Sequence, residues 1–106
     1  MPRFRTVREI ILTARDAQGV ERALEDALAR LAPEEIAALP RDCREAVLDR
    51  RADLHAAAVT LLQCDLKYRG DRDIGELVRQ LAELFASASV RLSQIEHRLP
   101  AGSGEP

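Results

Sequence analysis

The sequence predicts an all-α protein built around a long antiparallel helical hairpin. Aromatic residues make up 3% of the chain, and Gly and Pro number five each, so the composition favours helix over strand. Residues 73–99 also carry apolar residues alternately four and three positions apart, which is the spacing of a coiled-coil seam. A helix with such a stripe must bury it against other helices. The seam consists of Ile74, Val78, Leu81, Phe85, Ala88, Leu92, Ile95 and Leu99.

The N-terminal third predicts two short helices and a linking turn. The first helix is expected over Thr6–Arg15, and the second continues to Leu31. In one straight helix their apolar stripes would lie on nearly opposite faces, so we expect a bend near Gly19. Pro33, followed by two glutamates, predicts a short helical turn that Pro40 ends.

The hairpin itself is expected from helices over Asp42–Arg69 and Asp73–Leu99. Asp42 and Glu45 form a D-x-x-E pattern that resembles a capping box, and Gly70 marks the turn between the helices. Pro100 is expected to end the second helix. The sequence therefore predicts a single bundle-like helical domain over 1–100, with the hairpin packed against the N-terminal helices, and a disordered tail over 101–106.

The helix over Asp42–Arg69 carries a second apolar line beside the one that faces its hairpin partner. Two adjacent lines imply two packing partners, so the N-terminal helices or another subunit must cover the second one. We expect this line to form an interface, with Arg51 and His55 at its rim and a homodimer or helical protein partner as the result. The line consists of Leu48, Val59, Leu62 and Leu66.

Asp65 is a charged residue in the middle of the first apolar line. A carboxylate there is either desolvated or paired, and Arg69 lies four residues later in the favourable order for an ion pair. We expect a buried polar pair of Asp65 and Arg69; the alternative is a polar contact that specifies helix register or a dimer.

The two cysteines are predicted to be small buried hydrophobes. On one continuous helix Cys43 and Cys64 would lie roughly 30 Å apart, beyond the ~7 Å limit for a disulfide. Neither they nor the histidines show zinc-like spacing, and Glu-x-x-His pairs are absent, so we expect no metal and no cofactor. The apolar run Ile10–Leu12 is too short for a signal peptide, and free thiols suggest the cytoplasm.

These observations predict a non-enzymatic protein that acts through helix–helix contacts, by self-association or as an adaptor or regulatory subunit. Ser87, Ser89 and Ser93 have no identifiable base partner for nucleophilic catalysis. No stretch approaches the ~20 apolar residues of a membrane span. Small-molecule substrates are not expected.

Two alternatives remain open. A DNA-binding regulator would use Arg22 and Arg30 in the N-terminal helix pair, although neighbouring acids and the net charge of −2 disfavour nucleic acid. A histidine phosphotransfer module would use His55. Such modules place Lys and Gly soon after the histidine, whereas here Ala56, Ala57, Ala58 and Val59 follow.

Overall fold

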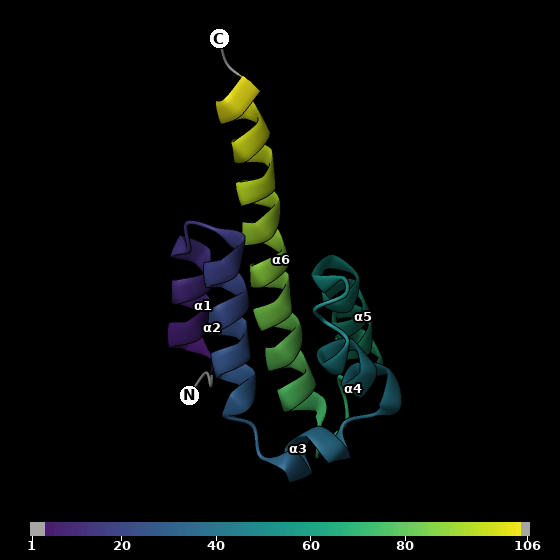
Figure 1. Cartoon of the computed structure of the whole chain (residues 1–106). Helices are drawn as coiled ribbons and strands as arrows, with labels where there is room; N and C mark the ends of the chain where they lie inside the picture. The colour runs from purple at the N-terminus through teal and green to yellow at the C-terminus, as the bar shows by residue number, and fades with distance from the viewer. Residues whose placement is uncertain (1–3, 105–106) are drawn as a thin grey trace.

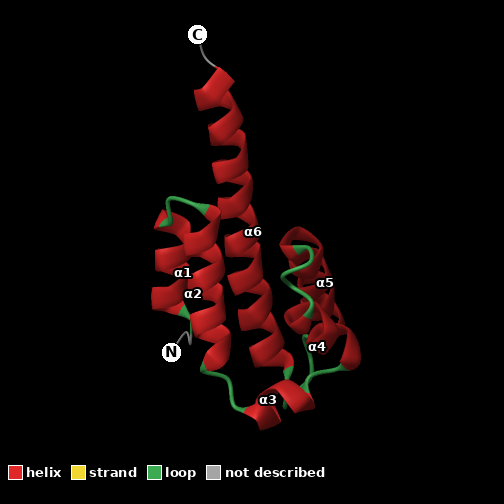
Figure 2. Ribbon diagram, viewed as in Figure 1, coloured by secondary structure: helices red, strands yellow, loops and turns green. Residues whose placement is uncertain are grey.

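The computed structural model is all-helical over the residues it describes, which confirms the predicted fold class (Figures 1 and 2). It describes the backbone of residues 4–104 and the side chains of residues 4–97. The helices are α1 (Arg5–Thr13), α2 (Ala17–Ala29), α3 (Pro33–Ala38), α4 (Arg41–Leu48), α5 (Leu54–Lys67) and α6 (Gly75–Gly104). None of the described helices combines the length and apolar character that crossing a membrane requires.

The long C-terminal helix α6 is the axis of the molecule. It packs against α1 and α2 on one side and against α5 on the other (Figure 1). The predicted seam is confirmed: Ile74 is half-buried, and Leu99 lies outside the described side chains. Ala82 and Leu84 are also buried, because α6 has neighbours on more than one side. The buried seam residues are Val78, Leu81, Phe85, Ala88, Leu92 and Ile95.

The N-terminal helices form as predicted, with a bend between them. Asp16 ends the linking turn, and its side chain accepts a hydrogen bond of 2.7 Å from the backbone N–H of Gly19, at the start of α2. Glu35 similarly accepts from the N–H of Ala32 at 2.9 Å and fixes the start of α3. Val20 and Leu24 then point into the core.

The predicted continuous helix over Asp42–Arg69 is wrong. The chain forms two helices, and α4 folds back against α5 across the segment 49–53. Both ends of the break carry local signals. The Arg50 guanidinium donates to the carbonyl of Val47 at 2.8 Å, and the Asp53 carboxylate accepts from the N–H of Ala56 at 3.0 Å as the N-cap of α5.

The shorter hairpin of α5 and α6 keeps its reversal near Gly70, as predicted. The turn continues to Ile74, and within it the Asp71 carboxylate accepts a hydrogen bond from the N–H of Ile74 at 3.0 Å. The capping box at Asp42 does not form, because Asp42 lies inside the first turn of α4 and Glu45 pairs with Arg41. At its far end α6 extends to Gly104, past the predicted end before Pro100. A proline removes one backbone donor there and disfavours the helix without forbidding it. The disordered tail over 101–106 stays a prediction.

Replacing Asp53 by alanine distinguishes the two-helix arrangement from a continuous helix. In the N-cap position, Asp53→Ala is expected to cost about 1 kcal/mol of unfolding free energy. In the interior of one long helix the same change would stabilise, because alanine is the better helix former. Urea unfolding followed by circular dichroism measures the sign. Gln63→Ala, at an exposed position within α5, serves as the control and should change stability by less than ~0.5 kcal/mol.

Candidate functional site

Most of the predicted interface line lies on the solvent-exposed side of α5. Val59, Leu62 and Leu66 are 54%, 44% and 69% exposed, and no helix of the described chain covers them. The N-terminal helices, one of the two partners the sequence allowed for this line, instead pack against α6.

Aliphatic side chains from two other helices extend this exposed surface. Leu12 of α1 and Val90 of α6 are 42% and 51% exposed, and with Leu62 they line a hollow of about 330 Å³. We call this hollow the apolar groove; it is bordered by Arg8 and Glu83, with Ala86 and Ser87 in its wall. Leu12 and Val90 lie outside the inner apolar stripes of their helices, so the sequence pattern did not predict them as part of this surface.

Leu48 does not share this surface, although it is 58% exposed. It belongs to α4, which lies beside the side of α5 that carries Ala56 and Thr60, where residues of both helices line a shallow hollow. Thr60 and Leu62 are two residues apart on one helix and so point about 160° away from each other. The break before α5 thus separates Leu48 from the other members of the predicted line.

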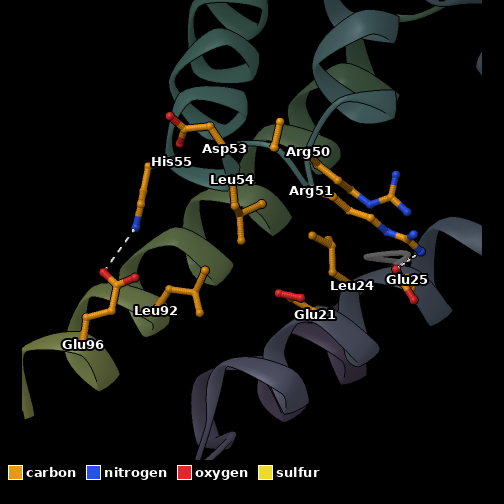
Figure 3. A pocket seen from close by; sticks show the side chains of 11 residues that line it. Glu21, Leu24, Glu25, Arg50, Arg51, Asp53, Leu54, His55, Leu92 and Glu96 are labelled. Carbon is orange, nitrogen blue, oxygen red and sulfur yellow. Dashed lines mark hydrogen bonds and ion pairs between the residues drawn. The ribbon is translucent and has the colours of Figure 1, made fainter. Parts of the chain in front are cut away.

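Arg51 and His55 lie beside a pocket of about 240 Å³ formed by α2, the segment 49–53, and α5 and α6 (Figure 3). Its apolar lining is Leu24, Leu54 and Leu92, and Arg51 pairs across it with Glu25. Acidic residues outnumber arginines around the pocket: its lining includes Glu21, Glu25, Asp53 and Glu96 on the acidic side and Arg50 and Arg51 on the basic side.

His55 contacts two residues of α6, and one of them corrects the sequence analysis. Its Nδ1 lies 2.6 Å from the hydroxyl oxygen of Ser89, and its Nε2 lies 3.6 Å from a carboxylate oxygen of Glu96. Ser89 therefore has a base partner. The backbone N–H of Ser89 lies inside α6, where helical bonding occupies it, so this N–H is not available as an oxyanion donor. The Glu96 carboxylate beside Nε2 also disfavours a phosphoryl group on this histidine.

Asp65 and Arg69 form an ion pair, but the pair is not buried as expected, because Arg69 lies on the surface. An Arg69 nitrogen lies 3.5 Å from one Asp65 oxygen, and the Asp65 side chain is 17% exposed against 67% for Arg69. The other oxygen, Oδ1, is buried without a hydrogen-bond partner. The ion pair therefore leaves one buried oxygen of the carboxylate without a hydrogen bond, which is costly.

Removing the two members of this pair is expected to change stability in opposite directions. Asp65→Leu should raise the unfolding free energy by about 1 kcal/mol, because it replaces an incompletely bonded carboxylate with apolar contacts. Arg69→Leu should lower it by a similar amount, because it leaves the carboxylate without its cation. Urea denaturation checks both. A loss of stability in Asp65→Leu would show that the ion pair stabilises the fold on balance.

A cluster that the sequence analysis ruled out lies between α4 and α5. Because α4 folds back, ligand atoms of Asp42, Cys43 and Cys64 all lie within 4.8 Å of one another, in place of the expected ~30 Å between the cysteines. Both cysteines are buried and free. Burial, assisted by the neighbouring groups, raises the pKa of the Cys43 thiol, and burial also raises that of Cys64.

Asp42 connects this cluster to the surface. Its Oδ1 accepts from the N–H of Cys43 at 2.9 Å and from the Tyr68 hydroxyl at 3.2 Å, and Lys67 lies 3.4 Å from Oδ2. Partial burial acts to raise the pKa of Asp42, but these hydrogen bonds and the Lys67 ammonium outweigh it and lower the pKa below its ordinary value. The carboxylate is therefore ionised at neutral pH.

Comparisons with protein-family models, with curated proteins and with solved structures find no match to this chain.

Proposed function

We propose that this protein acts through helix–helix association, and that its first partner is a second copy of the same chain. The observation that carries the proposal is the exposure of aliphatic side chains from α1, α5 and α6 on one surface. Such a protein would be an interaction or regulatory subunit, and it would need no catalytic site. Two free buried thiols fit a reducing compartment such as the cytoplasm.

Burial of this surface supplies a driving force for association. Fully burying a Val or Leu side chain is worth about 1.5–3 kcal/mol, and the exposed fractions of Val59, Leu62 and Leu66 leave roughly half of that unused. Contiguous apolar surface rimmed by polar residues is typical of protein interfaces. Arg8 and Glu83 supply such a rim along the apolar groove.

The shape of the surface favours a second copy as the occupant. The side chains of Val59, Leu62 and Leu66 lie three and four residues apart and so form a ridge on one face of α5, and Leu62 of that ridge also lines the apolar groove. A surface that carries both a ridge and an adjacent groove can pair with itself across a two-fold axis, as isologous dimers require.

Leu62→Glu is expected to weaken dimerisation at least about tenfold, because it places a charge between the ridge and the groove. Sedimentation-velocity centrifugation over a concentration series measures the dissociation constant. Unchanged helicity by circular dichroism would show that the variant folds, as expected for an exposed position.

Two control variants carry the same new charge elsewhere. Gln63→Glu adds it to an exposed position on another side of α5, and Leu48→Glu adds it to an exposed leucine on α4. Neither should change the dissociation constant more than about twofold. A wild-type protein that stays monomeric at every concentration would overturn self-association, and equal weakening by Leu48→Glu would move the interface to α4.

A further inference from the structure

The cluster of Asp42, Cys43 and Cys64 combines two thiols and a carboxylate from two helices at the contact between α4 and α5. We propose that Asp42, Cys43 and Cys64 bind a thiophilic divalent cation, with zinc as the best-fitting class. The site would tie the first turn of α4 to the last turn of α5 and hold the reversed chain in place. It shares no residue with the surface proposed for association.

The separations fit a tetrahedral ion. Zinc bonds of about 2.3 Å to sulfur and 2.0 Å to oxygen place ligand atoms roughly 3.5–3.8 Å apart. The three donor atoms already lie within 4.8 Å of one another, so coordination needs shifts of about 1 Å. Three protein ligands leave a fourth position for water. Asp42, whose side chain is 39% exposed, offers a route from solvent.

The charges fit the same ion. Binding replaces the protons of both thiols, so the two thiolates, the carboxylate and the divalent cation together carry one negative charge. The Lys67 ammonium, 3.4 Å from the carboxylate, balances that charge. Coordination also overcomes the burial that keeps the thiols protonated in the free protein, because a metal-bound thiol loses its proton outright. The Tyr68 hydroxyl, bonded to Asp42, holds the carboxylate in place.

Two sulfur ligands favour zinc over magnesium or calcium, which take oxygen ligands. The alternative is that Cys43 and Cys64 form a disulfide. The adjacent ionised carboxylate favours the metal, because it is a third ligand for a cation and has no role in a disulfide.

Cobalt(II) added to the reduced full-length protein tests the site directly. We expect thiolate-to-cobalt charge-transfer absorption that saturates at one equivalent and disappears when zinc is added. Zinc binding should release about two protons per ion, measured in a weakly buffered solution. It should also raise the temperature of unfolding, because the ion binds only the folded arrangement.

Variants assign the ligands. Cys43→Ser and Cys64→Ser should each weaken zinc binding by at least about a hundredfold, since loss of even an outer partner typically costs 10- to 100-fold. Asp42→Asn keeps the shape of the side chain and removes its charge, and this variant should also bind zinc more weakly. His55→Gln and His97→Gln are controls that leave affinity unchanged. Circular dichroism checks that each variant folds.

Wild-type protein alone is sufficient to overturn the proposal. Absence of the charge-transfer absorption with excess cobalt, while both thiols are shown to be free and the protein is folded, would exclude the site. Formation of a Cys43–Cys64 disulfide on mild oxidation, with no metal bound by the reduced protein, would also overturn it and would make the pair a redox link.

Discussion

The structure depends on burying the apolar surface of α6 on two sides at once. Leu81, Leu84 and Phe85 are fully buried at the middle of this helix, where α1 and α2 approach from one side and α5 from the other. One neighbouring helix covers a stripe, but not this wider arc. The positions of α1, α2 and α5 follow from that requirement. The N-terminal helices are therefore committed to α6, and no helix in the described part of the chain covers the outer surface of α5.

Once α5 is fixed against α6, the reversal at 49–53 determines which side chains of α4 lie against α5. A helix running on from α5 would extend past the core, whereas folding back lets Cys43 and Val47 of α4 join it. The Asp53 N-cap stabilises the break by about 1 kcal/mol, and the hydrogen bond from Arg50 to the Val47 carbonyl adds a similar amount; together these are less than the free energy that α4 gains by burial. The same reversal brings Asp42 and Cys43 to the end of α5.

The seam of α6 and the two N-terminal helices were predictable because each is a local periodic pattern. The break before α5 was not, because Val47, Leu54, Ala58 and Leu61 keep helical spacing across it. Both helices pack inward, so their apolar faces stay in phase although the backbone reverses. Asp53 was the available signal, since an aspartate before an apolar run is a typical N-cap. The exposed line on α5 could be predicted from its helical spacing. That Leu12 and Val90 lie next to it could not, because this depends on how α1, α5 and α6 pack together.

The two proposed surfaces lie on different sides of the same helix. Thr60 faces the α4 side of α5 and Leu62 faces the apolar groove, about 160° around the helix axis. A cation between α4 and α5 would restrain α4 without occupying the groove, and a second subunit in the groove would leave the thiols in place. Both ligands would nevertheless restrain α5: the cation by joining it to α4, and the second subunit by contacting its outer surface. Coupling between them therefore depends on how rigidly α5 sits in the monomer. The dense packing of Leu61 and Leu81, both fully buried, makes that position rigid and favours independent action.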